Sequence, residues 1–576
     1  MTPASNTLKA ILSSLVPRKE NKQTLSPARR DAGYSLSQSS PSRLSPALGT
    51  LNHDVLRLIA LELYRSGPEG LKPLASCSRT LRALLSPVLF SRCRRPSQLY
   101  PPEAIRPFVR YLTYTSSPSA VTTFTYFAHL LDCFPFLFSV SFERFHELPW
   151  SILSLCFSRP RITSISFDHG ADLTGPDSTP SEEVDTASLR ITRFLYDVRL
   201  WRDMDGWINP RLPPSRRNRD LLISRESQSL SALVPQMNHT LTQLLLPMES
   251  APIVKMAQLS WSKLRELSIS GLYWTSEQVE SLPILLGALP RLEKLSVRIR
   301  RELYQSEGRP PILGQHSTPR SVLSGMHSLT VAYPNPDDDI FIIDTSRLRH
   351  LSICDWPRHY NSLIYRRRYS PRSAYPILSS AECLSVLRRM DLPTLSSLEL
   401  VYLTSESGTD DDLLRYVATA FPQLSHLELH RYRANRKEEV DYEHIAEVLT
   451  AARSLRRVRL NLDFPDDHGP YCNEYEVRTK WRETFEEQYG PEITKIMEKC
   501  PELECVELLY HGIPRGTWAE FHPSRCATPR FVLEYDAEHM EPPLMPYKWY
   551  DLGSMWRPAP NSMMDRSTHR TVPQAT

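Results

Sequence analysis

Three short acidic runs are the residues in this 576-residue sequence best suited to binding a cation or moving a proton. They are Asp337-Asp338-Asp339, Asp410-Asp411-Asp412 and Asp466-Asp467-His468. The first two runs lie next to a turn or a helix start, where carboxylates stabilise the positive end of the helix dipole. No run has the ligand spacing of a cation loop, and a catalytic dyad at the third would need a distant partner. We therefore expect structural roles for these carboxylates and no metal site.

Motifs for nucleophilic and phosphate chemistry are missing from the sequence. It contains no G-x-S-x-G, no H-E-x-x-H and no glycine-rich phosphate loop, and only 18 glycines. The ten cysteines form no C-x-x-C pair and no zinc-type Cys/His spacing. We expect no catalytic residue, no metal and no cofactor, and we interpret the chain as a non-catalytic protein.

Two long segments combine arginine with aromatic residues. Residues 200–235 carry Trp201, Trp207, Arg216, Arg217 and Arg219; residues 355–376 carry Trp356, Arg358, Arg366, Arg367, Arg368 and Arg372 among four tyrosines. Such residues stack on bases or form protein-binding hot spots, and the alternative is a solvated loop whose arginines pair with acidic neighbours. The net charge of +4 gives no general support for nucleic-acid or membrane binding. An RNA-binding function would rest on these arginines alone, so we expect no nucleic-acid partner.

The elements that would position any site follow a repeat of the form apolar-x-x-apolar-x-apolar. It occurs as Val109/Leu112/Tyr114, Leu137/Val140/Phe142, Ile162/Ile165/Phe167, Ile191/Phe194/Tyr196, Leu241/Leu244/Leu246, Leu264/Leu267/Ile269, Leu292/Leu295/Val297, Met326/Leu329/Val331, Leu348/Leu351/Ile353, Leu395/Leu398/Leu400, Leu424/Leu427/Leu429, Leu455/Val458/Leu460 and Leu503/Val506/Leu508. The last two residues of each triplet alternate as in a short strand with one buried face. Several triplets follow an amphipathic helix, as in residues 413–421, 445–449 and 493–497. Strand and helix at this pitch bury their faces only by stacking on neighbouring units.

The triplet series resembles divergent leucine-rich repeats, whose period is about 20–29 residues. The resemblance implies an α/β fold: an irregular solenoid over residues 100–535 with parallel strands on its concave face. Insertions are expected near residues 200–235, 300–322 and 355–385. Side chains between the apolar residues of each triplet would face outward, and we predict a substrate-binding surface at His426, Glu428, Arg457, Arg459 and Glu507. The alternative is a non-repetitive α/β fold in which the pattern recurs by chance.

Residues 51–95 precede the repeats and contain three short helical patterns. Val55, Leu56, Ile59 and Leu63 share one helix face; Leu71, Leu74 and Cys77 form a second pattern; Leu81, Leu84 and Leu85 form a third that Pro87 should end. About forty residues is marginal for an independent core, so such a unit usually relies on a partner.

The order of these residues resembles the F-box, the motif that binds substrate receptors to the adaptor of cullin-RING ubiquitin ligases. Asn52 stands where the family has proline, and the first loop, residues 65–70, is longer than usual. The resemblance implies that a set of apolar residues either contacts the adaptor or packs the helices behind that contact. These residues are Leu51, Val55, Leu56, Ile59, Leu74, Leu81, Pro87 and Leu89. The chain would then be a substrate-recognition subunit of an SCF-type ubiquitin ligase, with a Skp-type adaptor, a cullin and an unknown protein substrate as partners. The alternative is a leucine-rich-repeat scaffold without a role in ubiquitination.

The two ends of the chain are poor in periodic apolar residues. Residues 1–50 are rich in Ser and Pro, and residues 541–576 are rich in Pro and Met, so we predict a disordered tail and an irregular tail. No apolar run reaches the roughly eighteen residues of a membrane helix. Cys77, Cys133, Cys500 and Cys505 lie in apolar runs, which indicates buried, reduced thiols and a cytoplasmic or nuclear location.

Overall fold

The computed structural model divides the chain into two units, residues 1–52 and 53–576. The residues that it describes are 52–66, 71–95, 100–115, 124–145, 147–168, 171–179, 189–197, 218–273, 275–300, 309–313, 323–356, 358–359, 376–405, 408–435, 438–464, 475–510, 517–523 and 529–533. Apart from Asn52, all of them belong to the second unit. The two predicted tails, and Leu51 of the predicted adaptor contact, lie outside the described residues.

The second unit begins with three short helices, α2 (His53–Ser66), α3 (Leu71–Cys77) and α4 (Arg79–Leu89). They share a small core in which Ala60, Leu71, Ala75 and Leu85 are buried. The Ser78 hydroxyl caps α4 by accepting a hydrogen bond from the backbone N–H of Leu81. The prediction that Pro87 ends the third helix is wrong, because α4 continues to Leu89. Pro87 is exposed and lies two residues before the end of α4, so it removes one backbone hydrogen bond near that end without stopping the helix earlier.

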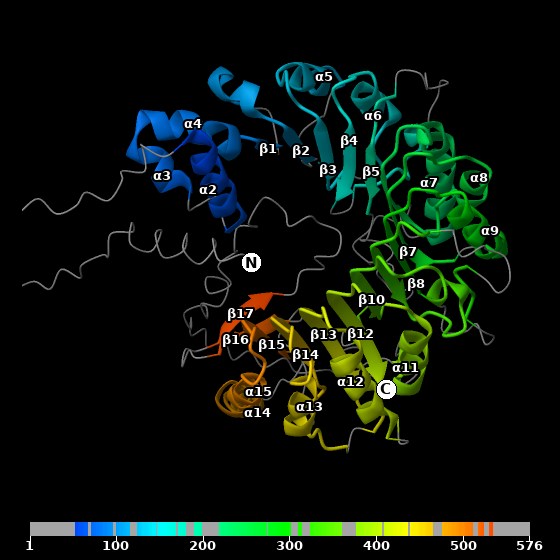
Figure 1. The fold of residues 1–576 in the computed structure, drawn as a ribbon. Coiled ribbons are helices and arrows are strands. Elements are labelled where there is room, and N and C mark those ends of the chain that lie inside the picture. Colours follow the sequence, from blue (N-terminus) through cyan, green and yellow to red (C-terminus); the bar gives the residue numbers. More distant parts are fainter. Residues whose placement is uncertain are drawn as a thin grey trace, which may run out of the picture. The chain divides into compact units, whose positions relative to one another are not determined.

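Parallel strands dominate the rest of the unit (Figure 1). The strands are β1 (Arg92–Arg95), β2 (Tyr111–Thr115), β3 (Ser139–Glu143), β4 (Ser164–Asp168), β5 (Arg193–Tyr196), β6 (Gln243–Pro247), β7 (Glu266–Leu272), β8 (Lys294–Arg300), β9 (Ser328–Ala332), β10 (His350–Cys354), β11 (Leu378–Ser379), β12 (Ser397–Leu403), β13 (His426–Tyr432), β14 (Arg457–Asn461), β15 (Cys505–Tyr510), β16 (Thr517–Phe521) and β17 (Arg530–Leu533). They form one 17-stranded sheet in which consecutive strands pair in parallel as far as β15. The exception is the two-residue β11, which pairs with the end of β12 while β10 pairs with its start.

The predicted triplets occupy equivalent positions along this sheet. The middle residue of each triplet pairs with that of the next, from Leu112 with Val140 to Val458 with Val506. All triplet residues except Leu503 are buried. Burial of one such aliphatic side chain contributes roughly 1.5–3 kcal/mol, so the shared register joins the strands into one continuous core. The predicted α/β class and the repeated parallel strands are therefore confirmed.

Helices cover one face of the sheet, and Figure 1 shows them along one side of the strands. These helices are α5 (Phe124–Asp132), α6 (Trp150–Phe157), α7 (Arg219–Leu233), α8 (Ile253–Ala257), α9 (Ser276–Gly287), α11 (Ser380–Arg389), α12 (Thr409–Ala420), α13 (Tyr442–Leu449), α14 (Tyr475–Thr484) and α15 (Gly490–Met497). Shorter turns are the 3₁₀ helices η3 (Glu103–Phe108), η4 (Pro176–Ser178), η6 (Val234–Met237) and η7 (Asp339–Phe341) and the π-helix η9 (Phe485–Tyr489). The opposite side, on which none of the described helices packs, is called the helix-free face below. In the described part of the chain, no helix is both long enough and apolar enough to cross a membrane.

A proline turn leads into seven of the strands. In each turn, proline is the second of four residues and the fourth donates its backbone N–H to the carbonyl of the first, at 2.9–3.3 Å. The four-residue turns are 106–109, 134–137, 159–162, 289–292, 392–395, 421–424 and 500–503. Proline suits this position because its ring fixes the φ that the turn requires. Prolines in these places therefore begin a repeat without interrupting an element.

Parts of two predicted insertions are regular structure. Residues 219–233 form α7, and residues 378–389 form β11 and α11. These residues therefore belong to the repeat region. Their sequences lack the strict triplet, and only their position between strands reveals the role. At the other end of the sheet, β16 and β17 run antiparallel to their neighbours, which the repeat did not predict.

Candidate protein-interaction site

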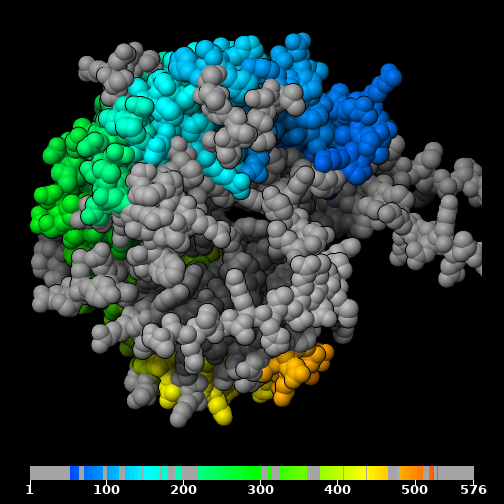
Figure 2. All heavy atoms as spheres, turned by 180° about the vertical axis from the view of Figure 1, so that it is seen from behind, coloured from blue at the N-terminus to red at the C-terminus, as the bar shows by residue number. Residues whose placement is uncertain are grey.

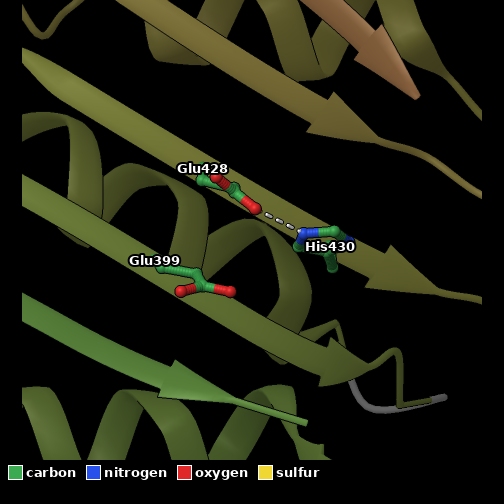
Figure 3. Close-up of side chains that lie close together, drawn as sticks. All are labelled: Glu399, Glu428 and His430. Carbon is green, nitrogen blue, oxygen red and sulfur yellow. Dashed lines mark hydrogen bonds and ion pairs between the residues drawn. The ribbon is translucent and has the colours of Figure 1, made fainter. Parts of the chain in front are cut away.

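The helix-free face from β8 to β15 carries the polar residues that lie between the apolar triplet residues. Because β-strands alternate, the pairing register arranges these side chains in rows that cross the strands. The first row consists of Lys294, Ser328, His350, Ser397, His426 and Arg457. The second row consists of Ser296, Thr330, Ser352, Glu399, Glu428, Arg459 and Glu507. Figure 3 shows Glu399 and Glu428 on adjacent strands, with His430 two residues beyond Glu428.

The acidic groups at the C-terminal end of the second row pair with basic side chains. Glu428 accepts from His430 Nε2 at 2.9 Å (dashed line in Figure 3) and from Arg459 at 3.2 Å. Arg459 also donates to Glu507 at 2.9 Å, and Arg457 reaches the other oxygen of Glu507 at 2.9 Å. Glu428 and Glu507 are thus both matched by arginines of the neighbouring strand β14.

Arg358 completes the network from the segment that follows β10. Its guanidinium lies 2.5 Å from Glu399, 3.2 Å from Asp355 and 3.5 Å from Glu428. Ser352 donates to the second oxygen of Glu399 at 2.6 Å. The sequence placed Arg358 in an arginine-rich insertion, and nothing in its spacing indicated which carboxylates it would meet. Most other residues of that insertion lie outside the described residues.

Burial and pairing act in opposite directions on the two central titratable groups. Burial alone would raise the pKa of Glu428, but the hydrogen bond and charge of His430, with Arg358 and Arg459, hold that pKa well below its usual range. Burial alone would lower the pKa of His430, but its hydrogen bond to Glu428 raises the pKa above the ordinary 6.5. Both shifts favour an ion pair between an ionised Glu428 and a protonated His430.

This pairing changes the interpretation of the predicted substrate-binding residues. Glu428, Arg459 and Glu507 are partners of one another, and the Glu507 side chain is 1% exposed. Their charges stabilise the sheet, so they offer few unsatisfied groups to a ligand. His426 and Arg457, which lie in the first row, are exposed. Of the predicted set, the first-row residues are the accessible ones.

An apolar cluster lies beside the second row on the helix-free face. It contains Ala332, Cys354, Val401, Tyr432, Leu509 and Trp518. Trp518 stands on β16 opposite Leu509, and the Arg459 guanidinium lies 5.1 Å from the Trp518 ring centroid. A ring contact with His430 at 5.7 Å joins the same tryptophan to the ion network. The second row is therefore held between apolar packing and the more exposed first row.

Glu399, Glu428 and His430 place three potential metal-ligand atoms within 4.8 Å of one another. The oxygens of both carboxylates already accept from arginine, serine or histidine, and His430 Nε2 points at Glu428. A cation would meet the Arg358 guanidinium, which lies within 3.5 Å of both carboxylates. The donor set therefore suits ion pairing better than metal coordination.

The acidic runs also have protein partners. The Asp338 side chain caps η7 through Ile340 N–H at 2.9 Å and accepts from Leu313 N–H. Asp410 pairs with Arg431 at 2.7 Å, and Asp411 lies 2.8 Å from His444. The run at residues 466–468 lies outside the described residues.

The three-helix segment presents a second candidate surface. Of the predicted adaptor-contact residues, Leu56, Ile59 and Leu81 are buried, Leu74 and Leu89 are half-buried, and Val55 and Pro87 are exposed. Leu58, which the sequence did not single out, is 66% exposed beside Val55 at 43%. Spacing i, i+3 on α2 was the available signal for this pair. Figure 2 shows the segment at the surface, next to the residues that follow it.

The thiols differ in part from the prediction. Cys500 and Cys505 are buried, Cys133 is half-buried and Cys77 is exposed at the end of α3. Cys77 occupies the outer side of a single short helix, so an apolar neighbourhood in sequence did not place it in the core.

No protein-family model and no curated protein matches the chain. Among solved structures, a chain in the crystal structure of the Rad7 and Elc1 complex in yeast is similar at 15% identity and a TM-score of 0.34. The match covers 71% of this chain and 88% of that chain. A TM-score at this level does not establish a common fold.

Proposed function

We propose that this chain is the substrate-recognition subunit of an SCF-type (cullin-RING) ubiquitin ligase, with divergent leucine-rich repeats. The three-helix segment would bind a Skp-type adaptor and, through it, a cullin; the repeats would hold a protein substrate. The subunit itself carries out no reaction. Holding the substrate beside a ubiquitin-loaded partner raises its effective concentration there.

The observation that carries this proposal is the pair Val55 and Leu58 on α2. Two apolar side chains lie in solvent at 43% and 66% exposure, while Leu56 and Ile59 beside them are buried. An apolar pair on a small, marginally stable unit suits a partner's groove. The F-box resemblance of residues 51–90 names the adaptor as that partner.

Affinity purification of the full chain after proteasome inhibition tests this proposal, with adaptor and cullin as the readout. Val55→Asp with Leu58→Asp should abolish their recovery, because burying unpaired charge in an apolar interface weakens binding by roughly a thousandfold. The matched control is Val254→Asp with Ile284→Asp, at positions 38% and 61% exposed on α8 and α9. Leu56→Asp with Ile59→Asp is a poorer test, because charges at these buried positions would destabilise the fold as well as any contact with the adaptor.

Equal recovery of the adaptor with both pairs of substitutions would contradict the proposed contact. Failure of the wild type to recover any adaptor would contradict the ligase function altogether. The second candidate, a repeat scaffold for protein–protein interaction, is favoured by Asn52 at the position of the family's proline. If the chain is such a scaffold, the same purification should recover its binding partners but neither adaptor nor cullin.

A further inference from the structure

The first row contains basic side chains that no described carboxylate pairs with, whereas the charges of the second row are paired. In the second row, Glu399, Glu428 and Glu507 balance the arginines and His430. Carboxylates near the first row lie at its ends: Glu266 is 2.8 Å from Lys294, and Glu507 is 2.9 Å from Arg457. Between those ends, the row offers only histidine and serine side chains.

Three basic side chains lie at or beside the middle of the first row. His350 and His426 are separated by Ser397 in the register, which places them about 10 Å apart across two strand spacings. Arg349 immediately precedes His350 and is exposed with it. Among the described residues, no carboxylate lies in ion-pair range of Arg349, His350 or His426. This stretch is an exposed, uncompensated basic surface.

Burial and nearby positive charges disfavour the protonated form of the two histidines. Burial, with the positive charges of His327, His426, Arg349 and Lys294, lowers the pKa of His350. Burial and the charges of Arg457 and Arg456 lower the pKa of His426, against a smaller opposing effect of Glu504. Glu293 is 3.8 Å from His327 and faces that end of the surface. A bound anion would offset these positive charges and favour the protonated form of both histidines.

We propose that Arg349, His350 and His426 bind an anionic segment of a partner protein, one that carries carboxylates or phosphates. Ser328 and Ser397 stand beside the cations in the same row and supply hydroxyl donors that suit either oxyanion. The second-row ion network keeps the strands beneath this surface in register. The inference rests on the proposed protein-binding function but does not require adaptor binding.

Fluorescence anisotropy with the full chain at pH 6 tests the site with two labelled peptides of equal charge. One contains glutamates, the other phosphoserines, and an uncharged peptide is the reference. Arg349→Ala with His350→Ala and His426→Ala should weaken both anionic peptides by tenfold or more. The control, Lys263→Ala with Arg291→Ala, removes two exposed cations in the turns before β7 and β8 and should leave both affinities unchanged.

Salt, pH and the chemistry of the ligand distinguish this site from non-specific binding. Affinity should fall with added salt and rise as pH drops from 7.5 to 5.5, and His350→Gln with His426→Gln should abolish the pH effect. Tighter binding of the phosphopeptide identifies phosphate as the ligand group, and equal binding identifies anionic charge in general. Equal affinity of the triple variant and the wild type would overturn the proposal, as would tighter binding of a single-stranded oligonucleotide. Val55→Asp with Leu58→Asp should leave peptide binding intact, so failure of the adaptor contact stays distinguishable.

Discussion

Glu428→Gln is the most direct test of the second-row network, because this carboxylate meets three cations. The substitution keeps the shape of the side chain but removes the charge that faces His430, Arg459 and Arg358 at 2.9, 3.2 and 3.5 Å. Removing one partner of a buried ion pair costs roughly 3–5 kcal/mol. The Glu428 side chain is 18% exposed, so we expect about 3 kcal/mol of lost unfolding free energy at pH 6.

The loss should depend on pH, with a sign that follows from the two pKa shifts. The raised pKa of His430 gives stability that is complete below pH 6.5 and disappears as the pH rises through the folded-state pKa. The lowered pKa of Glu428 gives stability that is present above pH 4.5 and disappears only as the pH falls through its folded-state pKa. The deficit of Glu428→Gln should therefore be largest near pH 6 and smaller at pH 9.

Urea unfolding at the two pH values measures this difference, with Trp518 close enough to His430 to report on the network. Glu502→Gln is the control, because Glu502 is 50% exposed and its pair with Arg456 at 2.8 Å should contribute less than about 1 kcal/mol. A deficit of the same size at pH 6 and pH 9 would show that Glu428 does not stabilise the protonated form of His430. A wild-type stability in Glu428→Gln would refute the ion network as a source of stability.

Three further variants test the sheet. Leu427 is 2% exposed at the middle position of its triplet, so Leu427→Ala should lower the unfolding free energy by about 3 kcal/mol in urea titration. A loss below about 1 kcal/mol, as expected for an exposed residue, would contradict the shared core. Arg457→Glu with Arg459→Glu should also destabilise the fold, by about 3 kcal/mol, because Arg459 is the partner of two carboxylates; a neutral effect would mean that these pairs do not form. Gly271→Ala should cost about 2 kcal/mol in thermal unfolding, since Gly271 has φ 125° and a Cβ there would collide with Glu249; unchanged stability would exclude that close approach.

The strands were predictable because the apolar pattern of each triplet is local in the sequence. An apolar residue at every second position specifies which face is buried, and a one-residue slip would expose Leu427 and its equivalents in all strands. β1, β11, β16 and β17 escaped prediction because they are edge or short elements whose pairing depends on neighbours far away in sequence. α7 escaped for a related reason: its residues do not show a clear apolar stripe, and its place between β5 and β6 defines it.

The candidate site was predictable in position but not in chemistry. Alternation correctly indicated that His426, Glu428, Arg457 and Arg459 share the face away from the triplets. It could not reveal that Glu428 and Arg459 neutralise each other across strands, because cross-strand pairing requires the register. Arg358 was beyond reach for the same reason, and Leu58 was hidden among residues whose exposure depends on the packing of three helices.

The proline turns have a consequence for the unfolded chain. A proline at the second position of a turn removes conformations that the unfolded chain would otherwise sample, so it stabilises the folded form without making a new contact. Residues 452–455 form the same turn before β14, with Leu455 N–H bonded to the Ala452 carbonyl at 3.2 Å and exposed Arg453 in proline's place. Arg453→Pro should therefore raise the unfolding free energy by about 0.4–1 kcal/mol in urea titration, and a loss of stability would show that this turn differs from its seven equivalents. By this route the prolines of these turns, which look like interruptions in the sequence, lower the entropy that their repeats lose on folding.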